Sequence, residues 1–529
     1  MKDMDRLVEI LAQKIRKQAH IRIIGDYDVD GVTSSHLFLT ALRRVGAKVD
    51  VVIPHRIQDG YGLSLHLLQQ AKEDGVDTIL TCDNGIAAID EIAWAKAQKM
   101  TVLVTDHHAV PFEEHEGRRT EKKSLADAVV NPHQQDCRYP YKELCGAGVA
   151  WNVIRVLYEN YDMDKREAED LLDFVAMATV CDVMSLTGEN RILVKEGLKR
   201  IRHTKNIGLQ ALMQACNVQP ENISAYHFGY VLGPCVNATG RLDTARHALR
   251  LFETGQETEA EEIARDLVDL NQERKELTLQ GVEMAKKLCE EGGYENDPIL
   301  VLFLPDVHES IAGLIAGRIR EMYNRPVFVL TRGEEGVKGS GRSTENYSMY
   351  ENMCGCAELF TKFGGHPMAA GLSLPEENVE KFRRKINENC PLTVEEVCPD
   401  IHIDMAMPVG YASTELVHQF ALLEPFGKDN PSPLFADRNL SISRMWVIGK
   451  NRNVLRMSVL SEYGQPVPVI FFGDVETLFA YFTEKFGQEE VENALHGRKN
   501  RILFSMVYTA KIDFYQGNEN LQLEMKYYR

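Results

Sequence analysis

The order of apolar and polar positions predicts a chain that begins as alternating strands and helices. Met4, Leu7, Leu11 and Ile15 recur at helical spacing, and the short apolar run Ile21–Ile24 follows them. Later runs have the length and composition of strands and are separated by helical stretches such as Ser34–Val45 and Ala87–Gln98: Lys48–Ile53, Thr78–Cys82, Thr101–Thr105 and Ala128–Asn131. Such alternation predicts an α/β fold with a largely parallel sheet covered by helices on both faces.

The middle of the chain changes pattern twice. From Gly146 to about Leu251 it is mostly helical, and the charged stretch Glu257–Glu291 has the length of a long connecting helix, with Gly292 and Gly293 as its stop signal. A second α/β unit follows, with a strand, a helix and another strand in that order: Ile299–Leu304, Ser310–Met322 and Pro326–Leu330.

The segment Pro391–Pro399 marks another boundary, and the remainder is rich in strand patterns with one helix at Val475–Phe486. A small OB-like β-barrel fits that order. The chain is therefore expected to divide into a first domain at residues 1–250, a connecting helix at 251–293, a smaller α/β domain at 294–394 and an OB-like domain at 395–529.

Composition narrows the class of protein. The 529 residues are 44% hydrophobic, which is ordinary for a globular chain and excludes a disordered or fibrous one. No window approaches the roughly 18 consecutive apolar residues of a membrane span, and the first 19 residues lack the apolar core of a signal peptide, so we expect a cytoplasmic protein. The net charge of −18 does not exclude nucleic acid as a partner, because phosphate binding depends on a local basic groove. Eleven cysteines without a C-x-x-C pair favour reduced, buried thiols.

Acidic residues follow several of the predicted strands. Gly25–Gly31 holds Asp26, Asp28 and Asp30 directly after an apolar run. It resembles the start of an EF-hand loop, but the twelfth position is Leu37 where a bidentate Glu is required, and a strand precedes it where an EF-hand has a helix. Three further sites follow apolar segments: Asp83, the triplet Asp106-His107-His108, and Asp182.

These acidic sites predict a metal centre. A single Asp after a strand is usually a helix cap or turn residue. In an open parallel sheet, however, the carboxyl ends of the strands converge on one crevice, where four such sites would repel one another unless cations neutralise them. The expected ligands are enough for two divalent ions: Asp28, Asp30, Asp83, His107 and Asp182. Carboxylates with one imidazole favour Mn²⁺ or Mg²⁺, and two such ions suit phosphodiester hydrolysis.

The triplet Asp106-His107-His108 resembles the name-giving motif of the DHH phosphoesterase superfamily, and the other acidic segments follow in the order of that family's motifs. Within it the chain is most similar to the bacterial exonucleases specific for single-stranded DNA. Four further segments carry this resemblance: Gly60–Leu63, Leu144–Gly148, Asn237–Asp243 and Glu424–Gly427. The resemblance implies processive hydrolysis from the 5′ end to mononucleotides, in DNA recombination and repair.

The resemblance also implies a role for each acidic residue. Asp28 and Asp30 would each bind a different ion, Asp83 would bridge the two, and His107 with Asp182 would complete the second site. Asp26 would be a further ligand. Asp106 would orient His107, and His108 would face the scissile phosphate and stabilise charge there.

Two glycine-rich segments of the second α/β unit predict loops that hold a phosphate. Gly339–Ser343 offers Ser340 and Arg342, and Phe363–Gly371 offers Gly364, Gly365 and His366. Taken together they resemble the substrate-binding domain of DHH phosphoesterases. The matching segment Asn237–Asp243 adds Asn237 and Arg241 to the substrate-binding residues that the resemblance implies.

The resemblance implies single-stranded DNA as substrate, with a DNA helicase and a single-strand-binding protein as partners. Two positions depart from the family pattern: Cys235 stands where Arg is common, and Leu304–Glu309 lacks an aromatic residue before His308. Two alternatives stay open: a phosphodiesterase for short oligonucleotides or cyclic dinucleotides, and a catalytically inactive nucleic-acid scaffold. A basic group offers a possible floor for a nucleic-acid groove: Lys195, Lys199, Arg200, Arg202, His203 and Lys205. Aromatic residues of the last domain are expected to be mostly core: Phe471, Phe472, Tyr508, Phe514 and Tyr515.

Overall fold

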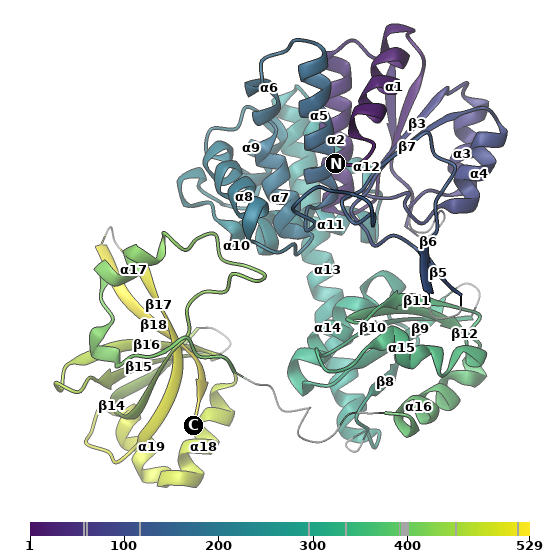
Figure 1. Ribbon diagram of the computed structural model, residues 1–529. Helices are drawn as coiled ribbons and strands as arrows, with labels where there is room; N and C mark the ends of the chain where they lie inside the picture. The colour runs from purple at the N-terminus through teal and green to yellow at the C-terminus, as the bar shows by residue number, and fades with distance from the viewer. Residues whose placement is uncertain are drawn as a thin grey trace. The chain divides into compact units, whose positions relative to one another are not determined.

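The computed structural model (Figure 1) divides into two compact units, Met1–Pro399 and Asp400–Arg529. It describes residues 1–56, 59, 62–115, 118–294, 297–333, 336–390, 392, 401–449, 452–515 and 518–529, without the side chains of 115, 118, 119, 514 and 515. The predicted domain boundary at 394 and 395, Gly60 and Tyr61 of the predicted motif, and the side chains of Phe514 and Tyr515 lie outside the described residues.

A five-stranded parallel sheet in the order β2-β1-β3-β4-β7 forms the centre of the first domain. Its strands lie close to the predicted ones: β1 (Ile21–Ile24), β2 (Val49–Val52), β3 (Thr78–Cys82), β4 (Thr101–Thr105) and β7 (Ala128–Val130). Because successive strand residues point to opposite faces, Ile23 and Leu103 join one core while Ile24 and Val104 join another.

Helices cover both faces of this sheet, as the sequence predicts. On one face lie α1 (Met4–Arg16), α2 (Val29–Arg44) and α5 (Gly146–Asn160), and on the other α3 (Leu65–Glu73) and α4 (Ile89–Ala97). The predicted helix Ser34–Val45 begins five residues earlier than expected, at Val29, because Asp28 caps it by accepting a hydrogen bond from the Gly31 N–H. The acidic segment is therefore partly helical.

The helical region that follows completes the first domain. It consists of α6 (Arg166–Glu169), α7 (Leu172–Cys181), α8 (Gly188–Ile201), α9 (Ile207–Ala215), η1 (Pro220–Asn222), α10 (Ala225–His227), the π-helix η2 (Phe228–Leu232), α11 (Gly233–Leu242) and α12 (Arg246–Glu253). The predicted connecting helix is confirmed as α13 (Glu257–Glu291), which packs on α9 and α11 with its first half and on α14 (Ala312–Tyr323) with its second. A small two-stranded ribbon, β5 (Phe112–His115) and β6 (Arg118–Glu121), projects from the domain.

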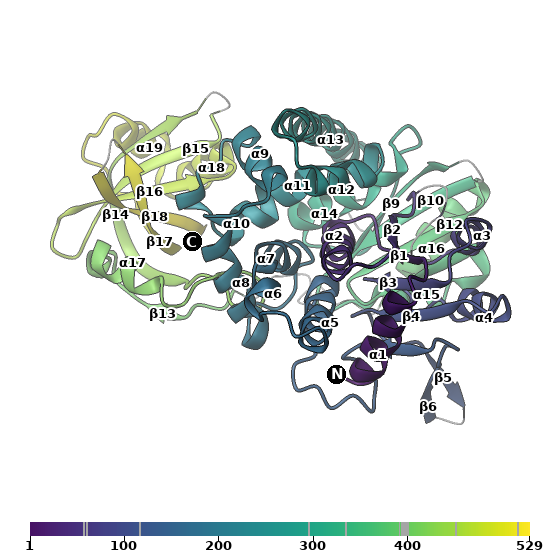
Figure 2. The same ribbon diagram turned by 90° about the horizontal axis from the view of Figure 1, so that it is seen from above.

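The second α/β domain contains a mixed sheet in the order β11-β12-β10-β9-β8 (Figures 1 and 2). Only β8 (Leu300–Phe303) and β9 (Val327–Gly333) pair in parallel; the remaining strands are antiparallel: β10 (Gly336–Arg342), β11 (Lys362–His366) and β12 (Ala369–Leu374). Helices and short turns join them: η3 (Glu309–Ile311), α15 (Met349–Cys354), η4 (Ala357–Leu359), η5 (Glu376–Asn378) and α16 (Val379–Glu388).

The two glycine-rich segments lie largely in strands β10, β11 and β12, with a turn at Pro367 and Met368, which corrects the prediction that they are loops. Glycine suits β10 because large neighbours occupy the space of a side chain: a Cβ at Gly339 would lie 2.3 Å from Leu330 Cδ2, and one at Gly341 would lie 2.5 Å from Met349 Sδ. The sheet therefore holds the polar side chains between these glycines more rigidly than a loop would.

The second unit is a β-barrel, which confirms the predicted OB-like domain. Its strands are β13 (Met405–Ala406), β14 (Phe435–Ile448), β15 (Val454–Leu460), β16 (Pro466–Phe472), β17 (Leu503–Tyr515) and β18 (Asn518–Tyr528). Pairing of β14 with both β15 and β17 closes the sheet. The helical elements are η6 (Val409–Tyr411), α17 (Thr414–Phe420), α18 (Val475–Phe486) and α19 (Gln488–Leu495). Strand β18 was not predicted.

Candidate metal centre and phosphate-binding cavity

The acidic segment turns sharply between β1 and α2, and glycines make the turn possible. A Cβ at Gly31 would come within 2.5 Å of the Asp26 backbone, and one at Gly25 would lie 2.0 Å from Ser35 Oγ. The turn places Asp26 and Asp30 in the interior while Asp28 is half-buried. Three carboxylates thus gather within five residues of the chain.

The N-terminus of α5 binds one of these carboxylates. The Asp30 carboxylate accepts hydrogen bonds from Gly146 N–H (2.6 Å) and Ala147 N–H (2.8 Å), where the helix dipole favours negative charge. Gly146 also lies against Asp83, since a Cβ there would be only 2.6 Å from Asp83 Cβ. Helix α5 therefore approaches the cluster so closely that only glycine fits.

The predicted ligands from distant segments converge on the ring of His107. His107 Nε2 lies 3.0 Å from Asp83 Oδ1, 3.6 Å from Asp182 Oδ2 and 3.7 Å from Asp30 Oδ2. Asp83 follows β3 with a left-handed φ of 61°, and Asp182 caps the C-terminus of α7. The strand ends and this helix end thus bring together residues from widely separated parts of the chain.

The role predicted for Asp106 is only partly correct. Its carboxylate accepts a 2.7 Å hydrogen bond from the backbone N–H of His107, but its ring contact, also 2.7 Å, is with His108 Nδ1. Its second oxygen accepts from Ile86 N–H at 2.9 Å. The tight turn after β4 brings the His108 ring back onto the Asp106 carboxylate. Asp106 therefore orients the His108 ring rather than the His107 ring.

The pKa values of the two histidine rings are shifted in opposite directions. Burial lowers the pKa of His107, which keeps its ring neutral and available as a metal ligand. Burial also opposes charge on His108, but the hydrogen bond to Asp106 and the surrounding carboxylates raise the pKa of His108 to about 9. His108 is thus a fixed cation beside the cluster.

Among the described residues, hydrogen bonds and positive charge compensate these carboxylates only in part. Burial first, and then the neighbouring carboxylates, raise the pKa values of Asp26, Asp28 and Asp83. Three buried atoms of this cluster make no hydrogen bond among the described residues: Asp26 Oδ1, Asp83 Oδ1 and His107 Nε2. Buried acceptor atoms that face one another without a hydrogen-bond donor between them indicate a site for a cation.

Three groups of side chains could each hold an ion, and they overlap. They are Asp26, Asp28 and Asp83; Asp83, His107 and His108; and Asp30, His107 and Asp182. Asp83 belongs to two of them, as a bridging ligand would. The donors are oxygens with imidazole nitrogen, which fits Mn²⁺ or Mg²⁺ and provides none of the thiolates of a structural zinc site.

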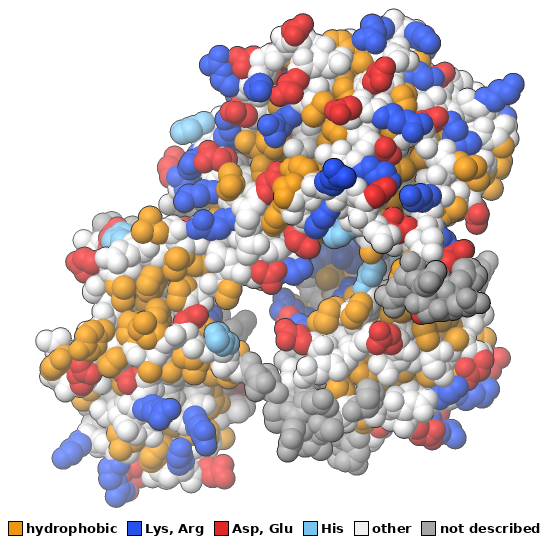
Figure 3. All heavy atoms as spheres, in the orientation of Figure 1, with side chains coloured by type: hydrophobic (Ala, Val, Ile, Leu, Met, Phe, Trp, Pro, Cys, Tyr) orange, Lys and Arg blue, Asp and Glu red, His pale blue; other side chains and the backbone are white. Residues whose placement is uncertain are grey.

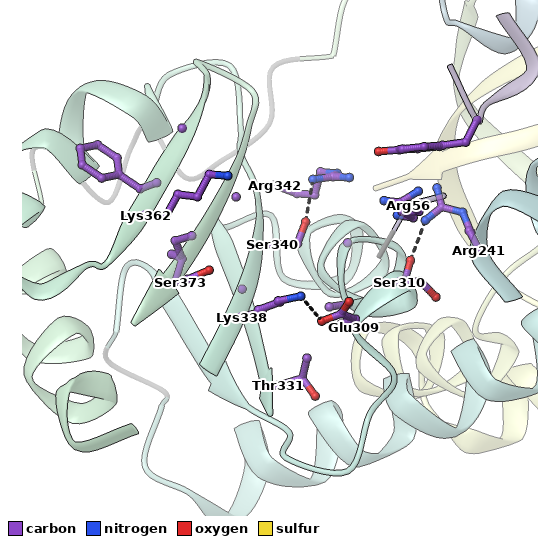
Figure 4. Close-up of a pocket in the computed structure, with 18 residues that line it drawn as sticks. Arg56, Arg241, Glu309, Ser310, Thr331, Lys338, Ser340, Arg342, Lys362 and Ser373 are labelled. Atoms are coloured by element: carbon purple, nitrogen blue, oxygen red, sulfur yellow. Dashed lines mark hydrogen bonds and ion pairs between the residues drawn. The ribbon is translucent and has the colours of Figure 1, made fainter. Parts of the chain in front are cut away.

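A cavity of about 450 Å³ adjoins this cluster and is strongly cationic (Figure 4). Its lining holds five basic side chains and one carboxylate, Glu309: Arg56, Arg241, Lys338, Arg342 and Lys362. Tyr27, which lies between Asp26 and Asp28 in the chain, also lines it, so the cavity opens beside the carboxylates. Figure 3 shows this face as a hollow in which basic and histidine side chains gather.

Three guanidinium groups converge in this cavity without a carboxylate partner among the described residues. Arg56, Arg241 and Arg342 point toward one another in Figure 4. Burial and then the neighbouring arginines lower the pKa of Arg241 to about 9, and burial with Arg56 lowers that of Arg342. Arg342 Nη1 donates to Ser340 Oγ at 3.2 Å, and Arg241 Nη1 donates to Ser310 O at 2.7 Å. Buried cations that repel one another are the arrangement expected of an anion site.

Some of the predicted substrate-binding residues line the cavity and others do not. Arg342, Ser340, Arg241 and Gly364 line the cavity; Gly365 and His366 are exposed and are not among its lining residues. Asn237 Oδ1 accepts a hydrogen bond from Val29 N–H at 3.2 Å, so it holds the acidic segment from the side of α11.

Sequence reasoning missed Tyr27, Arg56 and the N-terminus of α14. Arg56 Cζ lies 4.8 Å from the centre of the Tyr27 ring. Arg342 Nη2 packs against Gly313 of α14, where a Cβ atom would lie only 2.8 Å from it, so the glycine leaves room for the guanidinium. A signal for Arg56 existed, since a lone basic residue follows β2 at the same edge of the sheet as the acidic sites. Nothing in the local sequence indicated that α14 would face it.

Part of the predicted basic group lines another cavity, of about 820 Å³, together with His36, Asp173 and Phe252. Lys199 and Arg200 pair there with Glu196 and Glu169. None of the candidate metal ligands is among the residues that line this cavity.

Aromatic residues of the barrel are mostly core, as expected. Tyr508 and Phe471 are buried, whereas Phe472 is exposed. Trp446 is about one-third exposed, with Arg444 Cζ 5.6 Å from its ring centre, and it lines a shallow pocket with Arg456. Within the described part of the chain, none of the helices combines the length and hydrophobicity of a membrane span.

Three family models match the chain, in agreement with these parts. Residues 20–179 match the DHH family N-terminal domain, 296–390 the DHHA1 domain and 403–527 the RecJ OB domain. Single-stranded-DNA-specific exonuclease RecJ of Haemophilus influenzae is 32% identical over 545 aligned residues, which cover 99% of this chain and 90% of that protein. The protein of the same name from Bacillus subtilis is 34% identical, but this chain spans only 58% of its length.

Solved structures agree with the sequence comparisons. A crystal structure of RecJ in complex with Mn²⁺ from Thermus thermophilus superposes with a TM-score of 0.80 at 26% identity, covering all of this chain and 72% of that one. The same protein with Mg²⁺ gives a TM-score of 0.74 at 25% identity. An exonuclease RecJ bound to manganese is 32% identical over 73% of this chain, with a TM-score of 0.63.

Proposed function

Because the chain belongs to the RecJ family of single-stranded-DNA-specific exonucleases, we propose that it removes mononucleotides from a terminus of single-stranded DNA by metal-dependent phosphodiester hydrolysis. The observation that carries this proposal is the position of a cationic cavity beside a cluster of buried carboxylates: Tyr27, which lines the cavity, lies in the chain between Asp26 and Asp28 of the cluster. One region can bind an anion while the other binds the cations that hydrolysis needs.

The carboxylate cluster would hold two divalent ions. Asp26, Asp28 and Asp83 can form one site, and Asp30, His107 and Asp182 the other, with Asp83 near enough to His107 to bridge them. Two such ions supply an activated water and stabilise the oxygens of an in-line displacement. Burial keeps His107 neutral, the N-terminus of α5 holds Asp30, and among the described residues Asp26 Oδ1 and Asp83 Oδ1 accept no hydrogen bond that would compete with an ion.

His108 would neutralise charge on the scissile phosphate. Its ring is fixed by Asp106: burial opposes charge on the ring, but the hydrogen bond and the negative charge of Asp106 favour the protonated form. A cation held in a defined orientation stabilises the added negative charge of the transition state without reorganisation. His108 is therefore a catalytic residue in this proposal, and Asp106 is its positioning residue.

The arginine cavity explains why attack would occur at a terminus. A phosphate monoester carries more negative charge than a diester, so a terminal phosphate is the group that three converging guanidiniums would bind most strongly. With that phosphate beside Tyr27, the next phosphodiester would lie at the carboxylate cluster, and hydrolysis would release one nucleotide. The 5′ polarity and the processivity of this proposal come from the family resemblance.

The C-terminal barrel favours a polymeric substrate over a dinucleotide. A phosphodiesterase for cyclic dinucleotides needs only the first two domains, whereas this chain carries a barrel that matches the RecJ OB domain at residues 403–527. Trp446 with Arg444 and Arg456 offers a stacking surface with nearby charge, as single-strand-binding OB folds do. An inactive scaffold would have no use for the uncompensated carboxylates.

We extend the proposal, on the family resemblance, to DNA recombination and repair in the cytoplasm, with a DNA helicase and a single-strand-binding protein as partners. Co-purification of the tagged chain with and without nuclease treatment would test these partners. Recovery of neither protein without nuclease treatment would contradict this extension.

The experiment for the activity uses a 5′-phosphorylated single strand labelled at its 3′ end, incubated with the protein in Mn²⁺. We expect release of mononucleotides, loss of the full-length labelled strand with few products of intermediate length, as a processive enzyme gives, and no attack on the blunt duplex. Asp83→Ala should abolish hydrolysis while the far-ultraviolet circular dichroism stays unchanged, because both ion sites lose a ligand. Appreciable activity of Asp83→Ala, or products longer than a few nucleotides from the first turnover, would contradict the proposal.

A further inference from the structure

Two exposed tyrosines stack on the surface of the helical segment that packs against α7, the helix whose C-cap is Asp182. Tyr226 in α10 and Tyr230 in η2 have ring centres 5.1 Å apart and ring planes 24° apart. Their exposed fractions are 62% and 72%, while Phe228 and Leu232, on the opposite side of the same helical segment, are buried. Single exposed apolar residues are common, but an ordered aromatic pair in solvent is a feature of surfaces that bind a partner.

The tyrosine pair is anchored to the segment that supplies a metal ligand. Cys181, which precedes Asp182, donates from Sγ to the Phe228 carbonyl at 3.3 Å. A Cβ at Gly233 would lie 2.3 Å from the same sulfur, so the packing there leaves no space. Val183, on the other side of Asp182, is 62% exposed. The segment that carries the pair is thus packed closely against the end of α7 that supplies Asp182.

The helical segment 225–242 connects this surface to the cationic cavity. It runs without interruption through α10, η2 and α11, and η2 packs against α7 (Figures 1 and 2). At its far end Arg241 lines the cavity, a Cβ at Gly240 would lie 2.5 Å from the Tyr27 carbonyl, and Asn237 holds the acidic segment. The segment therefore passes the carboxylate cluster, with the phosphate cavity at one end and the tyrosines at the other.

The distance between the two ends suits a short length of single strand. Tyr230 precedes Arg241 by three helical turns, which corresponds to about 16 Å of helix at about 1.5 Å per residue. At about 3.4 Å per nucleotide a stacked strand would cover this distance with about five nucleotides. The π-helical turn, a conformation often found at functional sites, holds Tyr230 over Tyr226 on the solvent side.

We propose that Tyr226 and Tyr230 form a stacking platform for bases of the substrate strand a few nucleotides beyond the scissile bond, on the side away from the arginine cavity. This inference rests on the proposed exonuclease function. A terminal phosphate bound by Arg56, Arg241 and Arg342 anchors one end of the strand, and the platform anchors the part that has not yet been cleaved. Every base has a π-face, so such a platform binds without sequence preference and keeps the strand aligned as it shortens.

The test compares strand length in the full chain with Tyr226→Leu/Tyr230→Leu. A 5′-phosphorylated trinucleotide is too short to reach the platform, and a 12-nucleotide strand is long enough. In the double variant, we expect affinity for the 12-nucleotide strand, measured in Ca²⁺, to fall about tenfold to a hundredfold, the effect of losing one or two stacked bases. Hydrolysis of the trinucleotide in Mn²⁺ should stay within about twofold of the unmodified protein. Tyr226→Phe/Tyr230→Phe should keep the affinity, because the rings and not the hydroxyls stack on the bases.

Two controls separate stacking from general damage. Leu279→Ala removes an exposed apolar side chain from α13, 65% exposed, and should change neither measurement. Abasic sites at positions three to six of the strand should weaken binding to the unmodified protein but not to the Leu double variant. Equal losses on both strand lengths, or an unchanged affinity for the long strand, would overturn the platform. A lower melting temperature without loss of affinity would show that the tyrosines instead pack on another part of the protein, which also overturns it.

Failure of the platform and failure of the proposed function give different results. If the unmodified protein hydrolyses neither strand in Mn²⁺, the proposed function is wrong and the platform loses its premise. If it hydrolyses both and the Leu double variant matches it at both lengths, the function stands and the platform alone is refuted.

Discussion

Gly146→Ala adds a single methyl group next to the carboxylate cluster, and its effect can be worked out from the structure. A Cβ at this position would lie 2.6 Å from Asp83 Cβ and 2.9 Å from Asp83 Oδ1. Carbon atoms in contact normally stand about 3.5 to 4 Å apart, so Asp83 or the start of α5 must move by about 1 Å. Both are tied to the cluster, since the Gly146 N–H also donates to Asp30.

The displacement should cost far more activity than stability. Overpacking in a well-packed interior costs about 1 to 3 kcal/mol, which lowers the melting temperature by only a few degrees in a chain of this size. A shift of about 1 Å in a catalytic geometry can cost about a hundredfold in rate. We therefore expect hydrolysis of single-stranded DNA to fall about a hundredfold in Gly146→Ala, with a higher Mn²⁺ concentration needed for half-maximal rate.

The matched control is Gly148→Ala in the same helix. The three atoms nearest to a Cβ there belong to the Leu144 and Cys145 side chains, the closest at 3.3 Å. It should keep its rate within about threefold of the unmodified chain, because only a flexible side chain has to adjust. The assay is steady-state hydrolysis across a Mn²⁺ titration, together with thermal melting with and without Mn²⁺. If both alanine variants behave alike, the close approach of α5 to Asp83 has no functional consequence and the reasoning is refuted.

Three further predictions follow from other parts of the molecule. Arg342→Ala should raise the Michaelis constant for a 5′-phosphorylated strand about tenfold to a hundredfold and reduce the log–log salt slope of binding by about 0.7. The control Arg332→Ala, which removes an exposed arginine paired with Glu376 outside the cavity, should change neither quantity. Steady-state kinetics, with binding in Ca²⁺ at several salt concentrations, measures the two quantities, and equal behaviour of the two variants would contradict the phosphate assignment. His36 is buried, and burial, followed by the charge of Arg43, lowers the pKa of His36 to about 3. At pH values below about 6.5 the unfolded state therefore binds more protons than the folded state, and the contribution of His36 to stability falls as the pH falls. Urea unfolding should show the stability of His36→Leu relative to the unmodified chain rising by about 2 kcal/mol from pH 7 to pH 5, and a constant difference would contradict this. A chain that stops at Pro399 should bind long single strands more weakly but hydrolyse a trinucleotide normally, which filter binding and product analysis would check; equal losses would show that the barrel is structural.

Local sequence determined most of the elements and the identity of the acidic residues. Apolar runs such as Thr78–Cys82 and Thr101–Thr105 became strands at those residues, because a parallel sheet buried on both faces needs continuous apolar segments. The helix Glu257–Glu291 was readable for a similar reason, since a long stretch free of Pro with a glycine pair at its end is typical of a helix and its stop signal. The candidate ligands were also readable, since the carboxyl ends of parallel strands meet at one edge.

Tertiary structure decided which side chains of the site touch one another. The turn after β4 gives the Asp106 carboxylate to the His108 ring and leaves the His107 ring to Asp83, a difference of one position that no pattern in Asp106-His107-His108 encodes. The composition of the glycine-rich segments is that of turns and predicts loops, yet both lie largely in strands; in β10, Leu330, Leu372 and Met349 fill the space that side chains at Gly339 and Gly341 would occupy. Arg56, Arg241 and Arg342 come from three segments far apart in the chain, and their mutual repulsion is tolerated only because the packing of α11 and α14 holds them around one cavity. Such contacts between distant segments depend on side-chain volume and helix approach in three dimensions, and for that reason they could not be predicted from the order of residues alone.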